Sequence, residues 1–209
     1  QNLTIIGQSP LNTIIKGNSL KFISQGNLNI YTITLNDLTV NNNKNFTAVN
    51  VIFENNDGSY TGSYSNIYGG ALYSNGGNTI IESSTFRDNT ATYGGAVYVT
   101  GGSLTVVNSI FESNYANKYG GAIAGEANSN IIINDTDFTK CYTINNAGGA
   151  LYVRNSVLNV KKSNFTSCNA TLGGAICDLE SNSVLDSIIA NNNVANYQGG
   201  AVYKMYGKI

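Results

Sequence analysis

The chain has 209 residues with 11 basic and 12 acidic side chains, so its charge is nearly balanced and predicts no nucleic-acid partner. Charged residues make up only 11% of the chain, and 34 asparagines supply much of its polarity. There is no histidine, which excludes Ser-His-Asp and Cys-His catalysis and most transition-metal sites, and no apolar run is long enough to cross a membrane.

Residues 1–66 predict short strands separated by polar turns. Stretches such as "NLTIIG" at residues 2–7 and "FTAVNVIFENN" at residues 46–56 have the β-branched composition of strands. Both ends of the chain have this character, so we expect the sequence to be a segment of a longer protein. A longer loop is expected at residues 57–68, before a regular repeat begins.

The repeat is marked by Gly-Gly-Ala, which occurs six times at intervals of 25 to 28 residues. The copies do not match the glycine-rich loops that bind phosphate or the calcium β-roll motif. We therefore expect each glycine pair to form a structural corner, where a side chain would obstruct the bend or the close stacking of adjacent turns. These corner glycines are Gly69, Gly70, Gly94, Gly95, Gly120, Gly121, Gly148, Gly149, Gly173, Gly174, Gly199 and Gly200.

A phenylalanine followed three residues later by asparagine or cysteine lies between successive glycine pairs. The pairs are Phe86 with Asn89, Phe111 with Asn114, Phe138 with Cys141 and Phe165 with Cys168; Phe53 with Asn56 begins the series and Ile189 with Asn192 continues it. Apolar residues alternate at period two before each phenylalanine, which predicts a strand with one buried face.

These periods predict an all-β fold, a right-handed, single-stranded parallel β-helix (a solenoid) with about three short strands in each turn of about 25–28 residues. We expect a single domain over residues 1–209. In this interpretation residues 1–66 form less regular turns, and residues 67–209 form the six repeats that contain Gly-Gly-Ala.

Residues at equivalent positions of successive turns should be neighbours, and several such positions carry opposite charges. The sets are Arg87 with Glu112, Glu126 with Arg154, Asp178 with Lys204, and Asp135 with Lys162 and Asp186 in one column. Exposed pairs each contribute less than about 1 kcal/mol, so they favour the register more than they add stability.

Few carboxylates could serve polysaccharide cleavage. Asp135 with Asp137, and Asp178 with Glu180, could each share a strand face and act as acid and base. A lysine is expected beside one member of each pair, and solvated ion pairs explain these carboxylates without catalysis. We therefore predict no enzymatic activity and no catalytic, metal or cofactor site.

Tyrosines recur two residues after the alanine of the motif, at Tyr73, Tyr98, Tyr152 and Tyr203. If the aliphatic residue before each one is buried, alternation turns the tyrosines outward. Tyr68, Tyr93 and Tyr119, which precede glycine pairs, add to this expected aromatic ladder. An exposed ladder could stack on sugar rings or contact a partner protein, or it could only shield the strand edge.

Three cysteines and five glycosylation sequons are the remaining chemical groups. Cys141 and Cys168 occupy one column, and both a disulfide and a stack of reduced thiols fit their spacing. Cys177 is expected to be a small buried side chain. The sequons lie at Asn2, Asn45, Asn134, Asn164 and Asn169, several of which would occur by chance in so asparagine-rich a sequence.

The combination of Gly-Gly-Ala-[Ile/Leu/Val] with Phe-x-x-Asn resembles the repeats of chlamydial polymorphic outer-membrane proteins. The Asn/Thr-rich style of "NLTIIGQSPLNTIIKG" and "TLNDLTVNNN" resembles even more the adhesin-like surface proteins of methanogenic archaea. Residues 67–209 carry the paired motif, and residues 1–66 carry only the style.

This resemblance implies an exported protein, with its anchor outside this segment, that projects from the cell surface and functions in adhesion. The expected partners are proteins or glycans on host or microbial surfaces. Two alternatives stay open: a filament or envelope layer built by end-to-end association, since stacked turns have open ends, and a carbohydrate-active enzyme.

Overall fold

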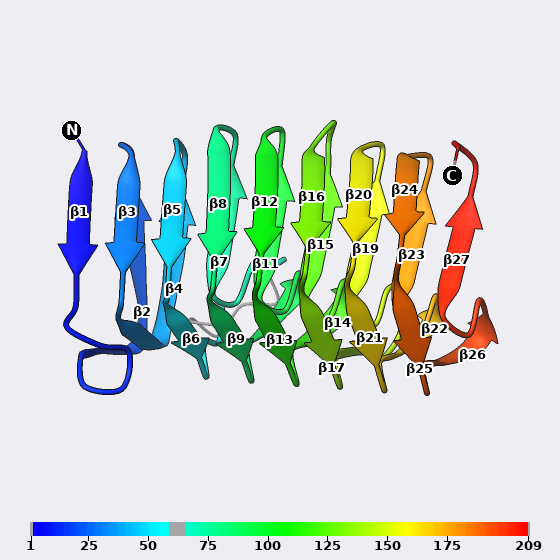
Figure 1. Cartoon of the computed structure of the whole chain (residues 1–209), viewed down its shortest axis with the longest axis horizontal. Coiled ribbons are helices and arrows are strands. Elements are labelled where there is room, and N and C mark those ends of the chain that lie inside the picture. The colour runs from blue at the N-terminus through cyan, green and yellow to red at the C-terminus, as the bar shows by residue number, and fades with distance from the viewer. Residues whose placement is uncertain (1, 59–65, 209) are drawn as a thin grey trace.

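The chain folds into a parallel β-solenoid, seen in a computed structural model that describes residues 2–58 and 66–208, except the side chains of residues 18–20. Residues 59–65, in the middle of the loop expected at 57–68, lie outside the described part. The strands stack along one axis with the two ends of the chain at opposite ends of the stack (Figure 1). The residues described contain no helix, and so none that could span a membrane.

The first row of strands is an eight-stranded parallel sheet, with one strand for each turn of the solenoid. Its strands, in spatial order, are β1 (Leu3–Ile6), β3 (Leu28–Tyr31), β5 (Phe46–Val49), β8 (Asn78–Glu82), β12 (Ser103–Val107), β16 (Asn130–Asn134), β20 (Val157–Lys161) and β24 (Asn182–Asp186).

The second row follows the first within each turn. It contains β6 (Ile52–Glu54), β9 (Thr85–Arg87), β13 (Ile110–Glu112), β17 (Asp137–Thr139), β21 (Asn164–Thr166) and β25 (Ile189–Asn191). The third row is a five-stranded sheet of β10 (Thr90–Tyr93), β14 (Tyr115–Tyr119), β18 (Tyr142–Thr143), β22 (Asn169–Leu172) and β26 (Val194–Gln198).

The fourth row completes each turn after the glycine pair. It contains β7 (Leu72–Asn75), β11 (Val97–Thr100), β15 (Ile123–Glu126), β19 (Leu151–Arg154), β23 (Ile176–Leu179) and β27 (Val202–Met205). The long strand β4 (Thr34–Asn42) joins the second and fourth rows into one sheet, and β2 (Ile14–Ser24) pairs with β4.

The predicted fold class is confirmed, because every strand pairs in parallel with the equivalent strand of the next turn. For example, Leu104 of β12 faces Thr79 of β8 on one side and Ile131 of β16 on the other. First-row strands run down the front of Figure 1 and fourth-row strands run up behind them while the chain advances towards its C-terminal end, which is the right-handed sense.

Each later turn has four strands rather than the three expected, and the extra strand belongs to the third row. The residues just before the glycine pair were not predicted to form a strand, but they pair across turns, as Thr90 does with Tyr115. The early turns lack this row because β4 runs directly from the second row to the fourth. There the partners Leu28 and Phe46 are only 18 residues apart in the chain.

The core is a column of stacked aromatic rings with aliphatic side chains from the first and fourth rows around it. The rings of Phe53, Phe86, Phe111, Phe138 and Phe165 are fully buried, and neighbouring centroids lie 4.4–5.0 Å apart. The prediction that Ile189 continues this column is wrong, because Ala190 lies opposite Phe165 and Ile189 is exposed. Equivalent residues of the last two turns are 25 positions apart in the chain, one more than that prediction assumed.

A ladder of buried asparagines runs beside the phenylalanine column. The Asn89 amide donates to Asn114 Oδ1 at 2.9 Å and to the Phe53 carbonyl at 3.1 Å, and the Asn89 N–H donates to the same Asn114 oxygen. Cys141 and Cys168 interrupt this ladder with thiols that donate to carbonyls at 3.5 and 3.8 Å. The last member is Asn193, whose oxygen accepts the Cys168 N–H, and not Asn192 as predicted.

The two glycines of each motif meet different requirements. Gly94 has φ +62°, a left-handed conformation that strains other residues. A Cβ on Gly95 would lie 2.2 Å from the Gly121 oxygen and 2.3 Å from the Tyr115 oxygen, because the backbone of the next turn passes directly against it. The pair therefore turns the chain and lets successive turns stack closely.

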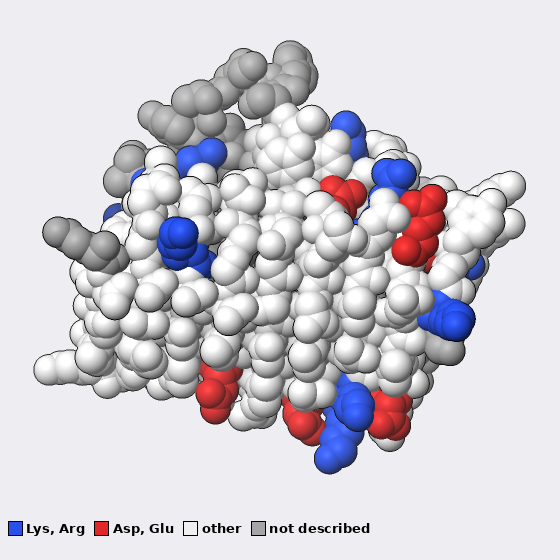
Figure 2. Space-filling model, turned by 90° about the horizontal axis from the view of Figure 1, so that it is seen from above, with Lys and Arg blue, Asp and Glu red and all other residues white. Residues whose placement is uncertain are grey.

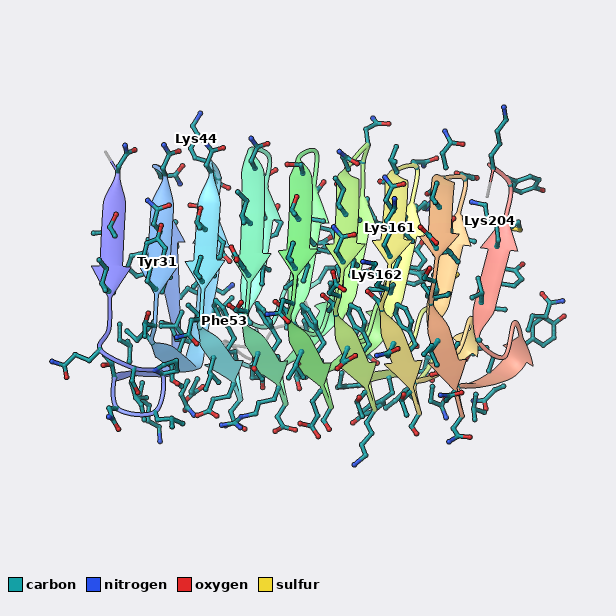
Figure 3. All side chains as sticks on the ribbon, in the orientation of Figure 1. Tyr31, Lys44, Phe53, Lys161, Lys162 and Lys204 are labelled. Atoms are coloured by element: carbon teal, nitrogen blue, oxygen red, sulfur yellow. The ribbon has the colours of Figure 1, made fainter. Side chains whose placement is uncertain are left out.

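The charged residues are arranged in register, with one correction. Arg87 lies between Glu54 and Glu112 on adjacent strands and forms an ion pair with Glu54. Asp186 pairs with Lys161 at 3.9 Å. The expectation that Lys162, labelled next to Lys161 in Figure 3, shares the column of Asp186 is wrong because of the same one-residue offset in the final turn.

Candidate functional site

The most distinctive surface is the one where the third and fourth rows meet, which we call the tyrosine side. Tyrosines before and after the glycine pair come from these two rows and pack on one another across turns. The side consists of Tyr68, Tyr73, Tyr93, Tyr98, Tyr119 and Tyr152, with Tyr115 and Tyr142 on the outer face of the third row.

The rings on this side are stacked along the solenoid axis. Tyr68 and Tyr93 have centroids 5.0 Å apart, and Tyr93 and Tyr119 have centroids 5.6 Å apart. Tyr119 then lies 4.3 Å from Tyr152, which belongs to the fourth row. Each of these rings therefore turns a face towards its neighbour.

The expected exposure of the ladder Tyr73, Tyr98, Tyr152 and Tyr203 is wrong for its central members. Tyr98 is 6% exposed and Tyr152 is 2% exposed, while Tyr73 and Tyr203 are half-buried. These side chains do point away from the main core, as alternation predicts. They are nevertheless covered, because the residues before the glycine pairs fold over them as the third row.

Burial fixes the ionisation state of the covered tyrosines. Desolvation, with the nearby Glu126 carboxylate as a further cause, raises the pKa of Tyr98 and of Tyr152 well above the ordinary value for tyrosine. The Tyr98 hydroxyl stays protonated and donates to Glu126 Oε2 at 2.7 Å. At the surface, the Lys118 ammonium lies 5.3 Å from the Tyr93 ring centroid and donates to the Tyr93 hydroxyl at 3.2 Å.

The outer face of the third row is the exposed part of this side. Tyr115 and Tyr142 stack there at 4.8 Å, and Ile144 and Tyr197 are 56% and 74% exposed. Sequence reasoning missed this face, although a signal was present: Tyr115 and Tyr142 each follow the Asn or Cys of the Phe-x-x-Asn motif directly. The face offers ring edges, hydroxyls and aliphatic groups together, which is the chemistry of a protein-binding surface.

The two carboxylate pairs considered for catalysis have different surroundings. Asp135 and Asp137 are both exposed, and Asp137 accepts a hydrogen bond from the Asn164 amide at 2.7 Å. Asp178 is buried in the column of Val153 and pairs with Lys204 at 2.5 Å, whereas Glu180 is exposed beyond the strand. Asp178 is thus a core residue, and among the residues described no cluster of three or more His, Cys, Asp or Glu could hold a metal ion.

The three cysteines are buried free thiols. Burial raises the pKa of the Cys177 thiol to about 12 and that of Cys141 well above its ordinary range. The predicted acceptors for glycosylation Asn2, Asn45, Asn164 and Asn169 are exposed, whereas Asn134 is half-buried.

Comparison with known families identifies the repeat. Residues 83–100 and 108–126 match the Chlamydia polymorphic membrane protein repeat. Each matched segment contains one Phe-x-x-Asn, one Gly-Gly-Ala and the strands of the second, third and fourth rows of one turn. The chain therefore carries repeats of this chlamydial type, as the resemblance of its Gly-Gly-Ala and Phe-x-x-Asn motifs predicted. Searches among curated proteins and among solved structures found no match.

Proposed function

We propose that this chain, built on polymorphic membrane protein-type repeats, is part of an adhesin-like protein of the cell surface and presents its tyrosine side to a partner protein. The observation that carries this proposal is the coincidence of the matched repeats with the tyrosine side, because residues 83–100 and 108–126 supply Tyr93, Tyr98, Tyr115 and Tyr119. The repeat family is named for membrane proteins, which supports a location at the surface.

A stalk must hold its binding face in a fixed shape. Backbone pairing between turns, the stacked phenylalanines and the asparagine ladder all run along the axis, so each turn is fixed by its neighbours. A preorganised face loses little conformational entropy on binding.

A protein partner fits the tyrosine side better than a sugar stacked on its rings. The ring faces of Tyr115 and Tyr142 are turned towards each other, so few faces are left for a sugar ring. Ring edges, hydroxyls and the exposed Ile144 and Tyr197 remain, and tyrosine is enriched in protein–protein interfaces. The proposal includes no catalytic step, and the ion pair of Asp178 with Lys204 supports leaving it out.

Binding to intact cells tests this proposal. The labelled segment is applied to candidate host and microbial cells, and the double substitution Tyr115→Ser with Tyr142→Ser is compared with Ile80→Ser with Val184→Ser on the first row. All four side chains lie on outer faces of the solenoid, so both variants should fold. We expect at least tenfold weaker binding for the tyrosine variant and unchanged binding for the control.

Treating the cells with protease before binding distinguishes the class of partner. Loss of binding after protease treatment supports a protein partner, and binding that survives protease contradicts it. Equal binding by the two double variants would refute the assignment of the tyrosine side. Antibody labelling of intact producing cells checks the surface location.

A further inference from the structure

A second candidate site lies at a different corner of the solenoid, where the fourth row passes into the first row of the next turn. It is a groove of about 300 Å³ that crosses the last three such corners, at the upper edge of Figure 1. One wall carries Asn128, Asn155 and Glu180, and the other carries Asn130, Val157 and Asn182. We call it the corner groove.

One wall of the corner groove, that of Asn128, Asn155 and Glu180, has no side chains at the corresponding corners of the preceding turns, whereas the other wall continues the column of Asn78 and Ser103. Those corners are the glycine pairs Gly76-Gly77 and Gly101-Gly102, and a Cβ on Gly101 would have no atom within 4 Å. Asn155-Ser156 and Glu180-Ser181 replace such a pair, with Asn155 and Glu180 in the left-handed conformation of the first glycine. Over three turns the chain thus adds one polar wall at a corner that forms without side chains in the preceding turns.

The floor of the groove is a serine ladder whose hydrogen bonds are already used. Ser156 Oγ donates to the Arg154 carbonyl at 2.9 Å and accepts the Ser129 N–H at 3.1 Å, while Ser181 Oγ accepts the Ser156 N–H at 3.2 Å. These bonds tie the three turns together beneath the groove. The floor is therefore rigid and offers few free hydrogen-bonding groups of its own.

The walls, by contrast, present unused amides. The side chains of Asn128, Asn130, Asn155 and Asn182 make no hydrogen bond to any described part of the chain, unlike the buried asparagines of the ladder. Each carboxamide has two donors and one acceptor oxygen. Their spacing follows the interturn distance of about 4.8 Å, so the groove offers regularly spaced donors and acceptors.

The charges at the groove nearly cancel. Glu180 is its single carboxylate, and Arg154 Nε lies 3.8 Å from it. A lone, partnered carboxylate does not suit a divalent cation, and a guanidinium held beside a carboxylate offers little to an anion. Figure 2, which looks down on this edge, shows acidic and basic side chains close to one another towards the C-terminal end of the stack. The ligand that fits is neutral and rich in hydroxyl groups.

From these observations we infer that the corner groove binds neutral carbohydrate, with the wall amides bonding to sugar hydroxyls and Val157 contacting the apolar side of a sugar ring. This site is separate from the tyrosine side and adds a glycan ligand to the protein partner proposed above. It does not depend on that proposal, because the two sites use different corners of the turn.

Glycine substitutions provide a test that spares the fold. The double substitution Asn128→Gly with Asn155→Gly removes two wall amides at positions with φ +61° and +47°, which glycine accepts without strain. The matched control is Asn50→Gly, an exposed asparagine with φ +55° far from the groove. The probes are a neutral glycan array and NMR titration with maltotriose, chitotriose and mannotriose, following the asparagine side-chain amide signals.

We expect at least one neutral glycan to bind and to shift the amide signals of Asn155 and Asn182, with at least tenfold weaker binding in the double variant. The Asn50→Gly control and the Tyr115→Ser/Tyr142→Ser variant should bind the glycan normally, which separates this inference from the proposed function. Failure of every neutral glycan to bind, or equal binding by the folded double variant, would overturn the inference. A preference for sulfated glycans or calcium would overturn the ligand class.

Discussion

Replacing the second glycine of a motif with alanine should have opposite consequences in the middle and at the end of the stack. In Gly95→Ala, the new methyl group would lie 2.2 Å from the Gly121 oxygen, whereas ordinary contact begins at 3.4 Å. The turns must therefore separate by about 1 Å, which carries inter-turn bonds such as Gly95 N–H to Gly120 O at 3.0 Å beyond hydrogen-bonding distance.

The expected loss of stability combines the cost of the steric overlap with the cost of the broken backbone hydrogen bond. Overpacking typically costs about 1–3 kcal/mol, and each buried backbone bond that is broken adds about 1–3 kcal/mol. With one such bond broken, we expect Gly95→Ala to lower the free energy of unfolding by about 2–6 kcal/mol, a large part of the roughly 5–15 kcal/mol that is usual for a domain.

Gly200→Ala is the matched control, because the nearest atom to its Cβ position is the Asn193 oxygen at 4.0 Å. This substitution should change stability by less than about 1 kcal/mol, and a small gain is expected from the restricted unfolded chain. Urea unfolding followed by circular dichroism measures both variants. Equal unfolding free energies for Gly95→Ala and Gly200→Ala would refute the close-stacking explanation of the motif.

Three further predictions concern the interior. Replacing Cys141 and Cys168 together with asparagine should complete the ladder and raise the free energy of unfolding by about 1–3 kcal/mol, and a lower urea midpoint would contradict this. Lys204→Met leaves the buried Asp178 unpaired and should destabilise by about 3–5 kcal/mol, while adding Asp178→Val, which matches Val153, should recover most of the loss in thermal unfolding. Burial raises the pKa of Cys177 to about 12 and the pKa of Cys141 well above its ordinary value, so neither thiol should react with iodoacetamide at neutral pH until urea unfolds the chain. Rapid alkylation of the native protein, measured by mass spectrometry, would count against their burial.

The solenoid could be predicted from sequence because its strongest signals are backbone requirements. A glycine pair that must turn the chain and admit the next turn cannot be replaced freely, so it recurs visibly at the period of the fold. The phenylalanine column is visible for the same reason, since each ring packs on the equivalent ring of the next turn. Where packing relaxes, as at Ala190 in the final turn, the signal disappears and the predicted register slipped by one residue.

The site was less predictable because alternation tells only which side chains leave the main core. It correctly turned Tyr98 and Tyr152 away from that core, but it could not show that a third row would cover them. That row is formed by short strands such as Thr90–Tyr93, which have no alternation long enough to recognise. The corner groove has a weaker signal still, namely the change from Gly101-Gly102 to Asn155-Ser156 at equivalent corners.

The tyrosine side repeats once per turn of the solenoid, and this repetition affects how a partner could bind. A ligand seated across two turns could move along the axis by one turn, about 4.8 Å, and meet a similar set of groups. The observed affinity would then be a sum over several overlapping binding positions instead of the affinity of one fixed site. Gain or loss of one Gly-Gly-Ala repeat would change the number of these positions while leaving the chemistry of each unchanged, so such a surface can be tuned by length as well as by substitution.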